Sequence, residues 1–178
     1  RCIGMTHQQH MAAVPQRELD EAGIGFSSAY RGREAWLKFY EAVERDLFPI
    51  MLTHTREWVQ EHFAPFLADP AWMDVPLSFV NGNLGPYHIL YDPADNSLAG
   101  ILDFGRAGSG DPAQDAAVLL YYYGEGFLRR LARYWPVLEG MIERARFIAG
   151  TVELQWALEG IQNSDSFGTL GYVGSARD

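Results

Sequence analysis

Cysteine and lysine are almost absent from this chain of 178 residues, which holds one cysteine, Cys2, and one lysine, Lys38. A lone cysteine forms no intrachain disulfide and no thiolate metal cage, so the composition favours a reducing compartment and a cytoplasmic protein. The first residues lack the long apolar core of a signal peptide. No stretch approaches the roughly 18 uncharged apolar residues of a membrane span. We therefore expect a soluble protein with no membrane partner.

Positive charge is also scarce, with 14 Lys and Arg residues against 23 Asp and Glu residues and a formal net charge of -9. A negative surface repels the phosphate backbone, which argues against a nucleic-acid partner. Such a surface would attract an amine-bearing small molecule, although acidity also serves solubility alone. With 48% hydrophobic residues, the chain can bury the core of one compact domain, and we expect residues 1–178 to form it.

Apolar residues recur at helical spacing in the first part of the chain, residues 1–75. The pattern is moderate over 5–19, where Pro15 interrupts it, and strong over 33–48 and 51–67. The aromatic residues of the two stronger segments are predicted to face the core rather than a cofactor.

Helical spacing returns over residues 107–163. The predicted helices cover 116–123, 127–134, 136–148 and 152–161, and a Gly- and Ser-rich tail follows over 164–178. Asp111 is a candidate N-cap, with Pro112 at the first helical position.

The middle segment, residues 76–106, has a different pattern. It contains short apolar runs over 77–80, 88–91 and 98–104, and a polar, turn-forming cluster over 92–96 separates the last two. Two short strands joined by such a turn predict a β-hairpin with Asp103 at its far end. The fold class that follows is α+β and mostly α-helical.

The same segment carries a motif with kinase spacing. The protein-kinase scheme is His-x-Asp, a second ligand five residues after that Asp, and then Asp-Phe-Gly. Here Asn81, Asn83 and His88 occupy the first three positions, and Asp103 begins the Asp-Phe-Gly sequence.

The region from about residue 78 to residue 123 resembles the C-terminal lobe of the aminoglycoside phosphotransferase family. The matching residues are Gly82, Leu84, Pro86, His88, Ile89, Leu90, Asp103, Phe104, Gly105, Ala107, Gly108, Gly110, Asp111, Pro112, Ala113 and Asp115. His88 is similar to the histidine of the 2''-phosphotransferase-like branch. The resemblance implies a protein-kinase-like C-terminal lobe. No Gly-rich nucleotide loop precedes it and Lys38 lies in a helical pattern, so we expect the N-terminal lobe to be absent.

The resemblance also implies roles for individual residues. Asp103 would hold Mg2+ against the phosphates of ATP or GTP, with His88 as the second ligand, and Asp115 would support the catalytic loop. Asn81 and Asn83 stand at the catalytic-loop positions. Carboxylates that could face a cationic small molecule, or lie on solvated helix faces, are Glu125, Glu143, Glu153, Glu159 and Asp165.

Asn83 stands where the family has its catalytic aspartate. An amide can hold a hydroxyl but cannot take its proton, and losing a general base costs roughly 10²–10⁴-fold in rate. The first interpretation is therefore a phosphotransferase lobe with weak or lost kinase activity. A second is reassignment to cyclisation, isomerisation or hydrolysis, with His88 and Asp103 as an acid–base pair. A third is a binding module whose exposed surface is covered by a partner or by a second copy in a homodimer.

Two other classes of enzyme are disfavoured. The chain contains no Gly-x-Ser-x-Gly sequence, which argues against a serine hydrolase elbow. His7 and His10 are three apart, without the His-Glu-x-x-His pattern of a zinc hydrolase. We expect both histidines on a solvated helix face.

Overall fold

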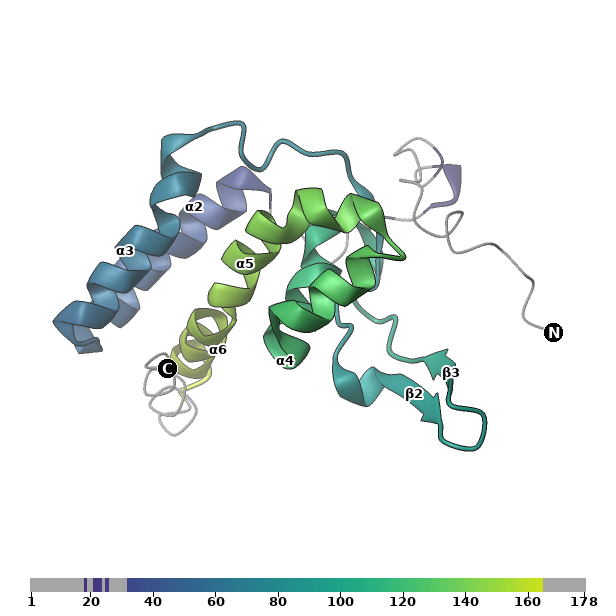
Figure 1. Cartoon of the computed structure of the whole chain (residues 1–178). Coiled ribbons are helices and arrows are strands. Elements are labelled where there is room, and N and C mark those ends of the chain that lie inside the picture. Colours follow the sequence, from purple (N-terminus) through teal and green to yellow (C-terminus); the bar gives the residue numbers. More distant parts are fainter. Residues whose placement is uncertain (1–17, 19–20, 24, 26–31, 165–178) are drawn as a thin grey trace. The chain divides into compact units, whose positions relative to one another are not determined.

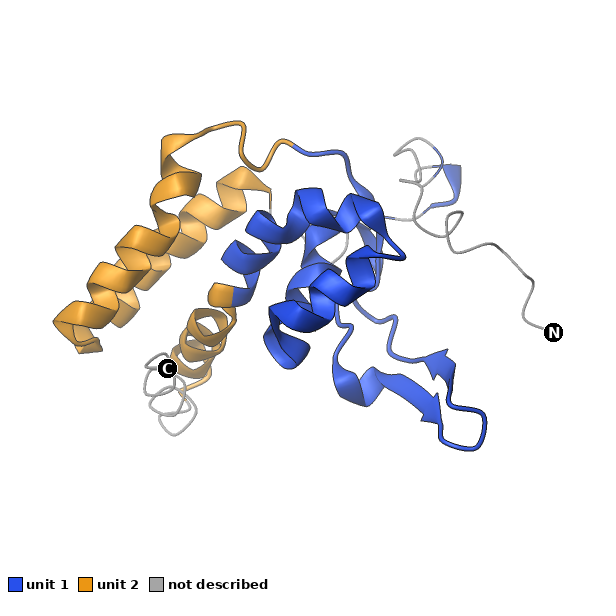
Figure 2. Cartoon of the chain, in the orientation of Figure 1, with its two compact units in different colours: residues 1–30, 75–149 blue, residues 31–74, 150–178 orange. Residues whose placement is uncertain are grey.

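The chain is organised as two compact units, each described here by itself. The structure, a computed structural model, describes residues 18, 21–23, 25 and 32–164. Unit 1 contains residues 1–30 and 75–149, and unit 2 contains residues 31–74 and 150–178 (Figure 2). The predicted helix over 5–19 lies almost wholly outside the described residues, as do His7, His10 and Asp165. The expectation of one domain stays a prediction.

The secondary-structure elements in the described part of unit 2 are all helical (Figure 1). Its elements are α2 (Arg33–Ala42), the π-helical turn η1 (Val43–Leu47), the 3-10 turn η2 (Phe48–Ile50), α3 (Thr53–Ala68) and α6 (Val152–Gln162). The helices predicted over 33–48 and 51–67 are confirmed. Pro49 lies inside η2, between α2 and α3. A proline has no N–H to continue a helical hydrogen-bond ladder, which explains why the two helices are separate.

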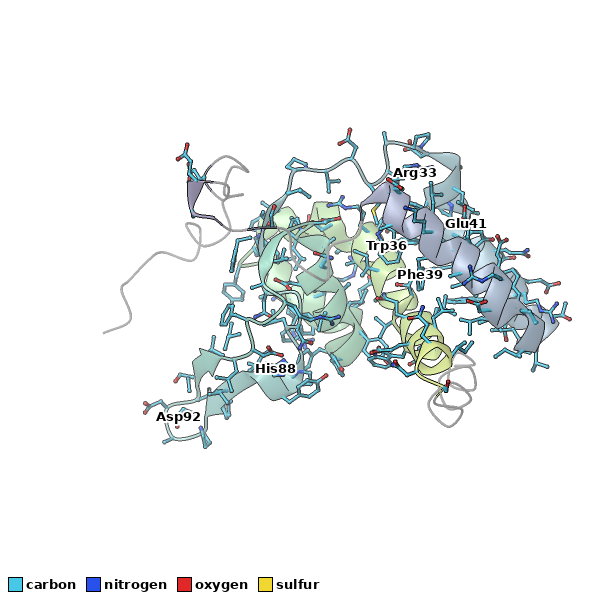
Figure 3. The ribbon with its side chains drawn as sticks, turned by 180° about the vertical axis from the view of Figure 1, so that it is seen from behind. Arg33, Trp36, Phe39, Glu41, His88 and Asp92 are labelled. Carbon is cyan, nitrogen blue, oxygen red and sulfur yellow. The ribbon has the colours of Figure 1, made fainter. Side chains whose placement is uncertain are left out.

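Three of the aromatic residues predicted for the core of unit 2 are buried. Trp36, Phe63 and Phe66 are 3%, 0% and 0% exposed, and Figure 3 shows Trp36 on helix α2. The prediction was wrong for Trp58, which is 42% exposed. Its indole stacks on the ring of His62 at 4.9 Å between centroids, so its ring is covered by a neighbour on the same helix rather than by the core.

Unit 1 contains two separate two-stranded antiparallel sheets. Strand β2 (Ile89–Asp92) pairs with β3 (Ser97–Ile101) as the predicted hairpin, which projects away from helix α4 in Figure 1. Strand β1 (Ser78–Val80) pairs with β4 (Gly108–Gly110), a strand that the apolar pattern did not predict. This second sheet brings the segment before the catalytic-loop motif beside the segment after Asp-Phe-Gly.

Three helical segments in the described part of unit 1 supply a buried core made largely of Ala, Leu and Ile, with Trp135 and Met141. They are α4 (Ala113–Ala132), the 3-10 helix η4 (Pro136–Met141) and α5 (Ile142–Gly150). Helix α4 is kinked at Gly124 (φ 74°, ψ 168°), between the two helices predicted over 116–123 and 127–134. The fold is α+β and mostly helical, as predicted. Within the described ranges, no helix is long and apolar enough to cross a membrane.

The N-cap of α4 is Pro112 rather than the predicted Asp111, but the Asp111 side chain still bonds to the first helical residue. Asp111 Oδ1 accepts a hydrogen bond from the N–H of Ala113 at 2.9 Å. The Arg144 guanidinium donates to both Asp111 oxygens, at 3.0 and 3.3 Å. The buried carboxylate is therefore paired with a cation and satisfied by hydrogen bonds.

Candidate functional site

The loop after β1 is held by the carboxylate of Asp115. Asp115 Oδ2 accepts a hydrogen bond from the N–H of Asn81, and Oδ1 accepts one from the N–H of Gly82, each at 2.8 Å. Gly82 has φ 76°, a conformation that favours glycine. The Asn81 side-chain oxygen in turn accepts from the N–H of Asn83 at 3.0 Å. These bonds fix the direction in which Asn83 leaves the loop.

Asp103 lies just beyond β3 and meets the side chain of Asn83. Asn83 Nδ2 donates to Asp103 Oδ2 at 2.7 Å, and the N–H of Gly105 donates to Oδ1 at 3.2 Å. Asn81 Nδ2 donates to the Asp103 main-chain carbonyl at 3.2 Å. The Asn83 amide, then the Gly105 N–H, and then the charges of His88 and Arg106 lower the pKa of the Asp103 carboxyl. The Asp103 carboxyl is accordingly ionised at neutral pH.

His88 ends the 3-10 turn η3 (Pro86–His88) at the base of the hairpin. Figure 3 shows Asp92 at the opposite end, next to the hairpin turn. The Nδ1 atom of His88 lies 2.8 Å from the main-chain oxygen of Asn83, so the proton of the neutral ring belongs on Nδ1. Its Nε2 lies 3.5 Å from Asp103 Oδ2. In the neutral ring, two lone pairs then face each other across this distance, and a proton or a cation between them would relieve their repulsion.

The donor set fits a magnesium ion that is shared with a phosphate. Magnesium commonly takes one or two protein carboxylates and completes its shell with phosphate oxygens and water. Asp103 supplies an ionised carboxylate whose side chain is 41% exposed. The imidazole of His88 is a softer ligand than magnesium prefers. The described part of the chain has no group of three or more His, Cys, Asp or Glu residues able to hold a metal, so phosphate oxygens would have to complete the shell.

Burial dominates the electrostatics of Asp115. It raises the pKa of the Asp115 carboxyl, while the hydrogen bonds from Asn81 and Gly82 lower it. Because these two N–H groups donate to it, the Asp115 carboxylate is hydrogen-bonded without requiring a water molecule. Asp115 acts on the candidate site through the loop rather than by touching a ligand.

Two of the acidic residues expected near a cationic substrate, Glu125 and Glu143, form ion pairs with arginines of unit 1. Glu125 pairs with Arg146 at 2.7 Å and with Arg129 at 2.5 Å, and Glu143 pairs with the same Arg146. Hydrogen bonds from the two arginines lower the pKa of Glu125. Glu153 and Glu159 lie on α6, in unit 2.

Sequence reasoning missed one pair of residues beside the site. The hydroxyls of Tyr87 and Tyr122 lie 2.6 Å apart, and the ring of Tyr87 packs edge-on against His88 with 4.7 Å between centroids. The two tyrosines are 35 residues apart, and no local pattern distinguishes Tyr122 from its tyrosine neighbours.

The known proteins to which this chain is similar in sequence and fold are phosphotransferases. The model of the family described as phosphotransferase enzyme family (APH) matches residues 6–148. Viomycin phosphotransferase of Streptomyces vinaceus is 34% identical over 133 residues, which cover 73% of this chain and 45% of that protein.

Solved structures share the fold. A GDP complex of aminoglycoside 2'-phosphotransferase-IIIa, 24% identical, superposes with a TM-score of 0.81 over 94% of this chain and 57% of its own. A macrolide 2'-phosphotransferase from Brachybacterium faecium, 18% identical, has a TM-score of 0.67 and covers 92% and 54%. The chain therefore spans about half the length of the proteins it matches.

Proposed function

Since this chain belongs to the phosphotransferase enzyme family, we propose that it carries the metal- and acceptor-binding half of a small-molecule phosphotransferase site. In this proposal Asp103 binds Mg2+ on the phosphates of ATP or GTP, His88 Nε2 is the second ligand, and Asn83 positions the acceptor hydroxyl. The observation that supports this proposal most directly is the 2.7 Å hydrogen bond from Asn83 Nδ2 to Asp103 Oδ2. It joins the position that would hold the acceptor to the one that would hold the metal.

The relatives support a small hydroxylated acceptor. One solved relative is a GDP complex and another a GDP and kanamycin complex. Others are named for viomycin and for macrolides. These names share phosphotransfer, and in our proposal the donor is a nucleotide and the acceptor is a hydroxyl of such a molecule.

Bound magnesium would neutralise charge on the phosphates, and the chain's own residues would do the rest by positioning. Asn83 can accept a hydrogen bond from the acceptor hydroxyl through its amide oxygen, because its Nδ2 already donates to Asp103. It cannot take the hydroxyl proton. Phosphoryl transfer runs through a loose transition state in which positioning and charge stabilisation dominate. Activity should therefore be slow, by roughly 10²–10⁴-fold, rather than absent.

A second candidate is acid–base chemistry by His88 and Asp103, which the 3.5 Å contact between His88 Nε2 and Asp103 Oδ2 favours. Two features count against it. His88 Nδ1 already faces the carbonyl of Asn83, so neither ring nitrogen points away from the chain's own acceptors. The low pKa of Asp103 makes its carboxylate a weak base.

Phosphotransfer assays separate the candidates. The chain, N83D, D103N and the hairpin-turn control D95N would be incubated with magnesium, ATP or GTP, and either kanamycin or viomycin. We expect slow product formation by the chain and by D95N, an increase of roughly 10²-fold in N83D, and none in D103N. Product formation by D103N at the rate of the unchanged chain, or an N83D variant no faster than the chain, would contradict the proposal.

A further inference from the structure

A pair of tyrosines lies beside the candidate site without a part in the chemistry above. Tyr87 belongs to the turn η3 and Tyr122 to helix α4, and both are in unit 1. Their hydroxyl oxygens are 2.6 Å apart. Tyr87 is 62% exposed and Tyr122 is 37% exposed, so a large part of two aromatic rings faces outward where the hairpin begins.

Short contacts link Tyr87 to Asn83. The Asn83 main-chain oxygen accepts hydrogen bonds from the N–H of Gly85 and from Nδ1 of His88, each at 2.8 Å. The Tyr87 ring packs against His88 and also lies over Gly85, where a Cβ atom would come within 2.9 Å of it. Because Gly85 has no side chain, the Tyr87 ring can lie against it, two residues along the chain from Asn83, the proposed acceptor position.

The neighbouring carboxylates are committed to arginines. Glu125 is held by Arg129 and Arg146, and Glu143 by Arg146. These four side chains sum to no net charge, so they offer little attraction to a polycation. Besides the Asp103 carboxylate, the exposed groups at this place in unit 1 are the rings and hydroxyls of Tyr87 and Tyr122.

We propose that Tyr87 and Tyr122 form the acceptor subsite, which takes a hydroxylated ring compound by stacking on the Tyr87 ring and by hydrogen bonds to the phenol pair. The proposal rests on the proposed function for the direction of the acceptor hydroxyl toward Asn83. A tyrosine presents a rigid apolar face with a polar tip, and it loses little conformational entropy when a ligand stacks on it. The Tyr87 oxygen keeps lone pairs for a ligand hydroxyl or amine.

Equilibrium binding tests the subsite without requiring turnover. Maltose, an uncharged hydroxylated ring compound, and kanamycin, a cationic one, would be titrated into the chain by saturation-transfer NMR and calorimetry. Given the usual strength of an aromatic contact, we expect Y87A and Y122A each to weaken both probes by about twofold to tenfold. Y134A, which removes a tyrosine that is 71% exposed, should bind both probes as the unchanged chain does. Maltose binding should not depend on salt.

A gentler variant guards against a folding defect. G85A keeps both tyrosines in the chain but displaces the Tyr87 ring, so it should also weaken the binding of maltose. Failure of both probes to bind, or equal affinity in Y87A, Y122A and the unchanged chain, would overturn the subsite. Stabilisation by magnesium nucleotide is measured in the same samples. If it persists while the probes fail, the subsite is wrong and the proposed function stands; if it is absent, the proposed function fails by itself.

Discussion

The side-chain amide of Asn83 donates a hydrogen bond to the carboxylate of Asp103, with 2.7 Å between Asn83 Nδ2 and Asp103 Oδ2. An amide at this position gives the carboxylate a partner in the absence of metal. It is the first cause of the low pKa of Asp103. An aspartate at position 83 would instead set two carboxylates against each other. With Asn83 in place of an aspartate, the site therefore lacks a general base, but its Asp103 carboxylate is hydrogen-bonded when no ligand is present.

The first prediction concerns N83D without metal. Two carboxylates at this distance raise each other's tendency to hold a proton, so the folded-state pKa of the pair should lie above its unfolded value. The variant should match the unchanged chain best at acidic pH and lose stability as pH rises through that raised pKa. The unchanged chain has the opposite slope from Asp103: its lowered pKa gives stability above the unfolded value, which is lost as pH falls.

Urea denaturation at pH 5 and pH 8, with and without magnesium, checks this prediction. Magnesium should restore N83D at pH 8, because a cation between the carboxylates removes their repulsion. N96D, which adds a carboxylate in the exposed hairpin turn, serves as the control and should show neither effect. An N83D variant with the same denaturation midpoint as the unchanged chain at both pH values would contradict the account.

The second prediction concerns Asp115, which accepts hydrogen bonds from the N–H groups of Asn81 and Gly82. D115A leaves both donors without this acceptor and should lower the free energy of unfolding by about 2–6 kcal/mol, given about 1–3 kcal/mol for each such group. D115N keeps one acceptor oxygen and should lose less.

A pH series refines the test of Asp115. Because burial raises the Asp115 pKa, the unchanged chain gives up some stability as pH rises from the unfolded pKa through the folded one. D115N should lack that component. Chemical denaturation of both variants between pH 4 and pH 8 measures it, and a D115A variant as stable as the unchanged chain would show that the loop is held by other contacts.

The third prediction concerns the kink in α4. Gly124 has φ 74° and ψ 168°, a region that is essentially restricted to glycine. G124A should therefore lower the free energy of unfolding by about 1–3 kcal/mol. G126A, two residues later on the same helix with ordinary space for a Cβ atom, should be neutral or stabilising by up to about 1 kcal/mol. Thermal denaturation of the two variants compares them, and equal effects would argue against a strained kink.

Local patterns predicted the elements that carry the site. Apolar runs on either side of the 92–96 turn gave the hairpin and placed Asp103 beyond its second strand. Strand β4 was missed because its Gly-Ser-Gly sequence has no apolar alternation, and its pairing with β1 depends on tertiary contact. Trp58 was predicted to be buried, since helical spacing does not distinguish a core face from its edge.

Pairings between distant residues marked the limit of the sequence. Motif spacing predicted that Asn83, His88 and Asp103 share a site, and the structure brings these three together. Motif spacing did not predict that Arg146 would pair with the Glu125 carboxylate, 21 residues away, because that pairing depends on tertiary contact. The role of Glu125 in substrate binding stays a prediction.

The most direct test of the central claim is a thermal-shift titration of the chain with Mg-ATP and Mg-GTP. D103N would be run beside it, with D95N as a control for the loss of a carboxylate elsewhere on the hairpin. The account predicts saturable stabilisation of the unchanged chain and of D95N by at least one nucleotide, dependent on magnesium, and none in D103N. No saturable shift in the unchanged chain, or the same shift in D103N, would contradict it.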